Sequence, residues 1–135
     1  MNDAQFLEAF DRSALQPGTF HHRDHVRLVW LALQEAPLLD AIARIRGGLL
    51  RLVKKLGAED RYHDTITCAL ILIIHDRAKA DPCPDWETFA QRNADLLEWN
   101  DGALLAPYYR RETLFSDLAR CTFVLPDLLQ MEVAA

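Results

Sequence analysis

A polar run turns directly into an apolar helix at Phe20-His21-His22-Arg23-Asp24-His25-Val26-Arg27-Leu28-Val29-Trp30. The apolar residues at its end recur at helical spacing, which predicts a helix that begins at His21 or His22. His22 and His25 lie three residues apart, and His22 shares one helical stripe with Val26, Val29 and Leu33. We therefore expect both histidines to face the protein interior.

The same design recurs at Glu59-Asp60-Arg61-Tyr62-His63-Asp64-Thr65-Ile66-Thr67, which runs into an apolar segment from Cys68 to Ile74. Its isoleucines suit a strand, but the length to about Ala80 and the lack of a hairpin partner favour a helix. His63 and Thr67 then open a core-facing stripe that continues through Leu70 and Ile74. Whether the two histidine clusters meet in space stays open at this point.

Further helices are expected before and between these clusters. Residues 3–11 form a short amphipathic helix capped by Asn2 or Asp3, and Pro17-Gly18 turns the chain ahead of a candidate cap at Thr19. Residues 38–56 form a longer helix that ends at Gly57. Inside it, Gly47-Gly48 indicates either a kink or a close approach to a neighbouring helix.

The C-terminal part is less regular. Asp85 is expected to cap a short helix, and residues 94–110 to form a loop with one or two helical turns. A last helix from about Glu112 to Cys121 is expected to turn apolar side chains to the core: Leu114, Phe115, Leu118 and Ala119. We predict an all-α fold, a single-domain bundle of five to six helices over residues 1–135, with an extended C-terminal tail from about residue 122.

Composition restricts the classes of function. The chain has 135 residues, half of them hydrophobic, and a formal net charge of −5. Such a charge argues against binding to nucleic acid or to anionic membranes, which requires a cationic surface. The chain has three cysteines and no C-x-x-C motif, which fits a protein of the reducing cytoplasm. Its N-terminus lacks the pattern of a signal peptide. We expect a cytoplasmic protein with a small-molecule partner, and homo-oligomerisation stays open.

The histidines are the candidate site. His22, His25 and His63 would form a nitrogen-rich centre for zinc, iron, manganese, nickel or copper, with Asp24 or Asp64 as a carboxylate ligand or ligand partner. Two other interpretations stay open. The histidines could act as a metal-free acid/base or binding site, or they could only satisfy helix ends.

The sequence supports two classes of function. In the first, the protein is a metal-dependent enzyme that polarises a water or substrate oxygen, while Asp24, Asp64 or Tyr109 position protons and Thr67 orients a polar ligand. In the second, the same pocket binds a small molecule without turnover, or the protein is an accessory or interaction protein whose histidines are structural. His75, at the far end of its helix, is expected to be structural.

The two histidine motifs resemble motifs of a known protein family. The chain resembles a poorly characterised family of small bacterial proteins in which F-x-H-x-D-H-V-R and Y-H-x-T-I-T recur, together with a Tyr-Tyr pair and a V-x-P-D ending. Here these correspond to Phe20–Arg27, Tyr62–Thr67, Tyr108-Tyr109 and Val124–Asp127. The resemblance implies no particular reaction, but it gives weight to His22, His25, His63 and Thr67 as one constellation.

Overall fold

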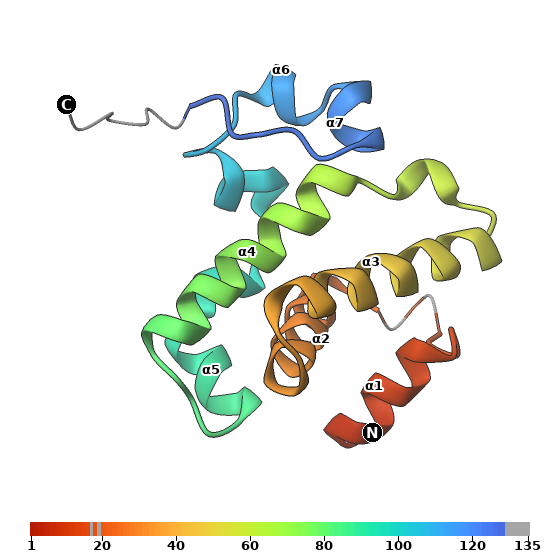
Figure 1. Ribbon diagram of the computed structural model, residues 1–135, viewed down its shortest axis with the longest axis vertical. Helices are drawn as coiled ribbons and strands as arrows, with labels where there is room; N and C mark the ends of the chain where they lie inside the picture. The colour runs from red at the N-terminus through yellow and green to blue at the C-terminus, as the bar shows by residue number, and fades with distance from the viewer. Residues whose placement is uncertain (17, 19, 129–135) are drawn as a thin grey trace.

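The computed structural model describes residues 1–16, 18 and 20–128, and all the regular secondary structure in these ranges is helical (Figure 1). The elements in chain order are α1 (Asp3–Asp11), α2 (His22–Glu35), α3 (Leu38–Lys55), η2 (Glu59–Arg61), α4 (Asp64–Ala80), α5 (Trp86–Arg92), η3 (Ala94–Leu97), η4 (Asn100–Leu105), α6 (Arg111–Leu114) and α7 (Asp117–Cys121). The all-α class is therefore confirmed. The expected count of five to six helices is not confirmed, because the described ranges contain seven α-helices and three short 3-10 helices.

Helix α4 lies in the middle of the molecule. It contacts α2 and α3 on one side and α7 on the other, so the C-terminal segments pack on a different face of α4 from the N-terminal helices (Figure 1). Its apolar run supplies buried side chains to both sides: Ile71 and Ile74 join the main core, while Ala69 joins a second cluster with Leu105, Tyr109 and Leu114. A helix that is buried on several faces needs the continuous apolar run seen in the sequence.

Several helix ends follow the sequence prediction. Asn2 Oδ1 accepts a hydrogen bond from Gln5 N–H at 2.8 Å, and Gln5 Oε1 accepts one from Asn2 N–H, which makes a capping box for α1. Asp85 Oδ1 accepts from Thr88 N–H at 2.8 Å and caps α5. Gly57 follows the end of α3 with φ +65°, where glycine is favoured. Pro17 and Thr19 lie outside the described residues, so the turn and cap expected there stay predictions.

The two glycines of α3 mark a close approach rather than a break in the helix. Helix α3 runs unbroken from Leu38 to Lys55, and Gly48 is buried within it. A Cβ atom at Gly48 would lie 2.2 Å from Phe10 ring carbons, whereas one at Gly47 would meet only Arg51 Nη1, at 3.3 Å. Gly48 therefore lets the Phe10 ring of α1 pack directly on the α3 backbone.

The prediction of a single last helix from Glu112 to Cys121 is wrong. The chain forms α6, breaks at Ser116, and starts again as α7, because the Ser116 hydroxyl accepts the Ala119 N–H at 3.1 Å as an N-cap. The break changes which side chains face inward. Leu114 and Ala119 are buried as expected, but Phe115 and Leu118 are 45% and 66% exposed.

The chain after α7 forms no regular secondary structure and is hydrogen-bonded to α4. Thr65, which is fully buried, donates its hydroxyl hydrogen to Thr122 O and accepts a hydrogen bond from Val124 N–H. Tyr109 donates its hydroxyl to Val124 O at 2.7 Å. Asp127 accepts from Arg110 N–H and Thr113 Oγ1–H. Residues 122–128 form no regular secondary structure, so the extended tail expected from about residue 122 stays a prediction. Within the described ranges no helix has the length and apolarity required to cross a membrane.

Candidate functional site

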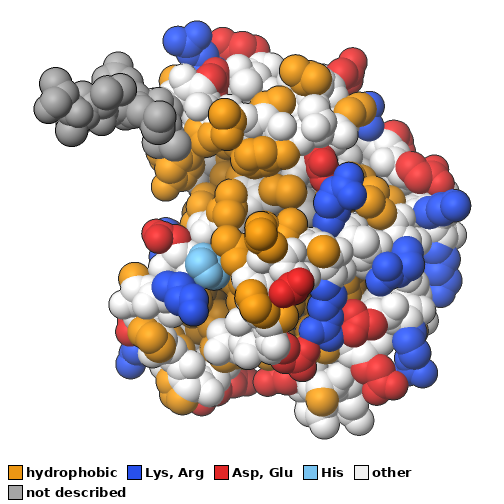
Figure 2. All heavy atoms as spheres, in the orientation of Figure 1, with side chains coloured by type: hydrophobic (Ala, Val, Ile, Leu, Met, Phe, Trp, Pro, Cys, Tyr) orange, Lys and Arg blue, Asp and Glu red, His pale blue; other side chains and the backbone are white. Residues whose placement is uncertain are grey.

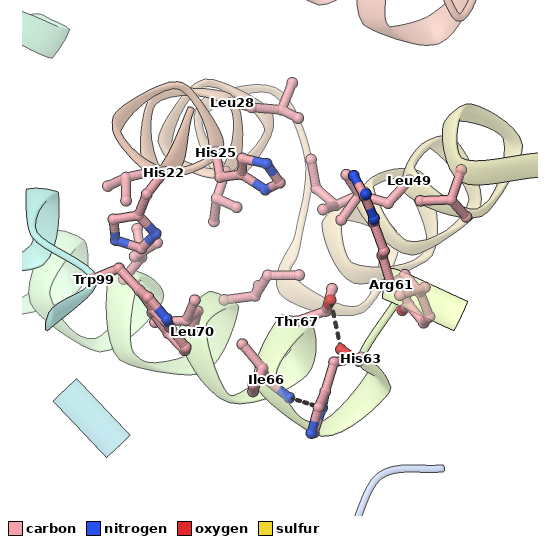
Figure 3. A pocket seen from close by; sticks show the side chains of 17 residues that line it. His22, His25, Leu28, Leu49, Arg61, His63, Ile66, Thr67, Leu70 and Trp99 are labelled. Carbon is pink, nitrogen blue, oxygen red and sulfur yellow. Dashed lines mark hydrogen bonds between the residues drawn. The ribbon is translucent and has the colours of Figure 1, made fainter. Parts of the chain in front are cut away.

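A cavity of about 340 Å³ lies between α2, α3 and α4 (Figure 3). Its wall is mainly aliphatic, and the polar members come from the two histidine clusters. We call it the histidine cavity. Its lining residues are His22, His25, Val26, Leu28, Val29, Ile45, Leu49, Val53, Arg61, Tyr62, His63, Ile66, Thr67, Leu70, Ile71, Ile74 and Trp99. Both predicted stripes therefore border one space, because α2 and α4 pack side by side.

His22 lies at the end of the cavity near Trp99, with 5.6 Å between the ring centroids (Figure 3). Its Nε2 lies 2.8 Å from Leu96 O. Since a carbonyl oxygen only accepts, Nε2 carries the proton, and Nδ1 of the neutral ring is an acceptor. The hydrogen bond to η3 fixes the orientation of the ring.

Of the three candidate histidines, His25 makes the fewest hydrogen bonds to described residues. Its ring stacks on Phe20, with centroids 4.1 Å apart and planes 19° apart, and neither ring nitrogen has a hydrogen-bond partner among the described residues. The pKa of His25 is lowered to about 4, mainly by burial and also by the neighbouring His22, while Asp24 opposes both effects. His25 is therefore neutral at pH 7 and offers the cavity one N–H donor and one acceptor nitrogen.

His63 borders the cavity, but its ring is turned away from it (Figure 3). Nδ1 accepts the Ile66 N–H at 3.1 Å and so caps α4, and Nε2 donates to Leu114 O of α6 at 2.6 Å. Both ring nitrogens are thus engaged. Burial lowers the pKa of His63, which favours the neutral form that this cap requires.

Thr67 and Arg61 complete the polar part of the wall. Thr67 donates its hydroxyl hydrogen to His63 O at 2.9 Å, so its oxygen is left as an acceptor. Arg61 is exposed at the rim and makes no ion pair with any described residue. Its η2 neighbours Glu59 and Asp60 are also exposed, but neither lines the cavity.

The three other candidate residues lie outside the cavity wall. Asp24 Oδ2 accepts the His21 N–H at 2.9 Å and closes the first turn of α2. Asp64 is buried and accepts from Arg46 Nε–H and from the Tyr62 hydroxyl, and this carboxylate together with burial raises the pKa of Tyr62. Tyr109 is buried on the opposite side of α4. The proton-positioning roles expected for these residues therefore find no support in their positions.

The three-histidine metal centre expected from the sequence is not assembled. His63 has no free ring nitrogen, and the described part of the chain contains no group of three or more His, Cys, Asp or Glu side chains that could hold one metal ion. The donors that remain for a metal are Nδ1 of His22 and one nitrogen of His25. Metal binding by His22, His25 and His63 stays a prediction.

Sequence reasoning missed two parts of the site. The α3 wall of Ile45, Leu49 and Val53 belongs to an ordinary amphipathic pattern, which says nothing of a cavity. Arg61 directly precedes Tyr62-His63 at the start of α4, and this adjacency was the one signal that could have placed it at the rim.

A second groove lies on the other side of α4. It has a volume of about 370 Å³ and is lined by Ala69, Leu72, Ile73, Asp76, Leu105, Tyr108, Tyr109, Phe123, Leu125 and Pro126. Figure 2 shows hydrophobic side chains gathered over this part of the molecule, beside α4 and the C-terminal segments. This groove contains Tyr109 but none of the three candidate histidines.

Comparison with known proteins adds no further assignment. No protein-family model, curated protein or solved structure matches this chain. The resemblance drawn from the two histidine motifs therefore stays a prediction.

Proposed function

We propose that this protein binds a small, largely apolar molecule in the histidine cavity. The observation that carries the proposal is His25: a neutral imidazole whose ring nitrogens have no partner among the described residues, in an aliphatic cavity of about 340 Å³. Partly buried polar groups normally have hydrogen-bond partners, and a ligand would supply the missing one. A volume of this size lies within the usual range for small-molecule sites.

The neighbours of His25 support a fixed rather than an adaptable site. His22 is held by Leu96 O, His63 by Ile66 N–H and Leu114 O, and the Thr67 hydroxyl by His63 O. A cavity whose polar groups are already oriented costs little conformational entropy when the ligand enters.

The proposal is tested by a screen of small molecules against the purified protein, read out as a rise in melting temperature. Leu70→Trp fills the histidine cavity and should remove the response to any ligand that the screen finds. Leu72→Trp is the matched control, because Leu72 lies on the same helix but lines the second groove. Circular dichroism of both variants checks that the fold is kept. A ligand whose binding is lost equally in both variants would contradict this location.

The second candidate function is the metal-dependent enzyme expected from the sequence. It is favoured because His22 and His25 line the same cavity and each has a ring nitrogen, Nδ1 in His22, that could bind a metal. A metal there would lack a third side-chain ligand among the described residues, so a bound molecule would complete its coordination. Product analysis separates this candidate from simple binding, because a binding protein returns its ligand unchanged.

The metal is tested by elemental analysis of protein purified without a histidine tag, and by melting temperatures with zinc, iron(II), manganese, nickel and copper. If a metal binds, the stabilisation should persist in His63→Asn and disappear in His25→Phe, since both ring nitrogens of His63 are engaged while His25 has a nitrogen with no partner among the described residues. Stabilisation that depends on His63 would contradict this assignment.

A further inference from the structure

Apart from the exposed Arg61 guanidinium at its rim and the Trp99 indole N–H, the histidine cavity offers more hydrogen-bond acceptors than donors. In its neutral form His22 has its one N–H committed to Leu96 O at 2.8 Å, and Figure 3 shows one ring nitrogen on the cavity side. Thr67 has committed its hydroxyl hydrogen to His63 O, which leaves an acceptor oxygen. His25 adds one acceptor and one donor. At the histidines and Thr67, a ligand that donates a hydrogen bond therefore finds more partners than one that only accepts.

The charges around the cavity disfavour an anionic ligand. The buried part of the wall has no fixed cation, because His25 is neutral at pH 7 and Arg61 is exposed at the rim. Glu59 and Asp60 precede Arg61 in the same short helix without lining the cavity, and the chain carries a net charge of −5. A carboxylate that entered the cavity would lose its hydration without gaining a buried cation.

We propose that the ligand is an uncharged, largely apolar molecule with a hydroxyl or N–H group that donates a hydrogen bond to the nitrogen of His25. The inference rests on the proposed function and names the chemical class of ligand for the same cavity. Aliphatic side chains from α2, α3 and α4 contact the apolar body of this ligand. The donor group lies at the histidine end, near Trp99.

The test uses three probes of one ring size: phenol, toluene and benzoate. Affinities for the full-length protein are measured by calorimetry or by two-dimensional NMR titration. Phenol should bind, and benzoate should bind at least about tenfold more weakly than phenol, because its charge is desolvated without a partner.

The variant His25→Phe separates the hydrogen bond from the shape of the site. It keeps an aromatic ring against Phe20 and removes both nitrogens. Phenol affinity should fall about tenfold, which is the usual worth of one buried hydrogen bond, while toluene affinity should stay within about twofold. His75→Gln, which changes a histidine of α4 that lines neither space, should leave both affinities unchanged.

The outcomes distinguish this inference from the proposed function. Benzoate binding more tightly than phenol, or equal losses for phenol and toluene in His25→Phe, would overturn the ligand class but leave a binding cavity. The ligand class is also overturned, and the binding cavity kept, if none of the three probes binds while the wider screen finds a ligand whose binding is abolished by Leu70→Trp. If no small molecule binds at all, both proposals fail.

Discussion

Three histidines that look equivalent in the sequence take three different states, and the difference arises from single hydrogen bonds. His22 has one nitrogen committed, His63 has two, and His25 has none with a described partner. The last state is the costly one, because desolvation without a partner makes protonation of His25 unfavourable and lowers its pKa. Within the described part of the chain, His25 is therefore the one histidine of the three with both ring nitrogens open to a ligand.

The depressed pKa of His25 predicts how stability depends on pH. In the unfolded chain His25 protonates near pH 6.5, whereas in the folded protein it does so only near pH 4. Between these values the unfolded state binds the extra proton, so stability falls as the pH is lowered. From about pH 7.5 to about pH 5, the wild type should lose about 2 kcal/mol more unfolding free energy than His25→Phe. Urea denaturation at both pH values measures this, and equal losses would contradict a buried, neutral His25.

Gly48 and Gly47 should respond oppositely to substitution by alanine. At Gly48 the new methyl group would overlap the Phe10 ring, and overpacking of this kind costs about 1 to 3 kcal/mol. At Gly47 the nearest atom belongs to the flexible Arg51 side chain, so the higher helix propensity of alanine should stabilise the protein by up to about 1 kcal/mol. Thermal unfolding of the two variants checks the sign, and two stabilised proteins would show that α1 does not pack on α3 at Gly48.

At the scale of elements, the C-terminal helices show how one cap redirects a whole segment. The pattern of Leu114, Phe115, Leu118 and Ala119 suits one continuous helix, yet Ser116 ends α6 and caps α7. The new helix starts with its own phase, so Leu118 faces solvent while Ala119 is fully buried. The apolar period alone does not reveal such a restart, because both phases contain apolar residues.

The division into α6 and α7 predicts that Leu114 and Leu118 contribute very differently to stability. Leu114→Ala should destabilise the protein by about 2 to 5 kcal/mol, because Leu114 is 3% exposed in the second cluster. Leu118→Ala, at 66% exposure, should change the unfolding free energy by less than about 0.5 kcal/mol. Similar losses in chemical denaturation would favour the single continuous helix instead.

At the scale of the whole molecule, α4 connects the histidine cavity to the C-terminal segments. Its first turn bears His63, which bonds to Leu114 O, and Thr65, which bonds to Thr122 and Val124. One turn later, Thr67 faces the cavity. The start of α4 thus borders the cavity on one face and contacts the C-terminal chain on another.

Thr65 is the residue that tests this attachment. Thr65→Val conserves shape but removes the hydroxyl that bonds to Thr122 O and Val124 N–H, so it should cost about 1 to 3 kcal/mol. Thr65→Ser keeps the hydroxyl and should retain slow amide exchange at Val124, which Thr65→Val should lose. Hydrogen exchange followed by NMR measures both, and unchanged protection in Thr65→Val would show that the C-terminal chain is held elsewhere.

Local signals were enough to predict the all-α class, the bounds of the first helix, a cap at Asn2 or Asp3, the cap at Asp85, and the inward stripes of α2 and α4. These features depend on residues close together in the chain, whose spacing and side-chain oxygens act within one or two helical turns. The packing of α2 against α4 decided that both stripes border one cavity. Leu114 and Leu96, each more than fifty residues from the histidine it contacts, decided which ring nitrogens stay free. Long-range hydrogen bonds of this kind depend on how helices pack, and helical periodicity carries no information about them.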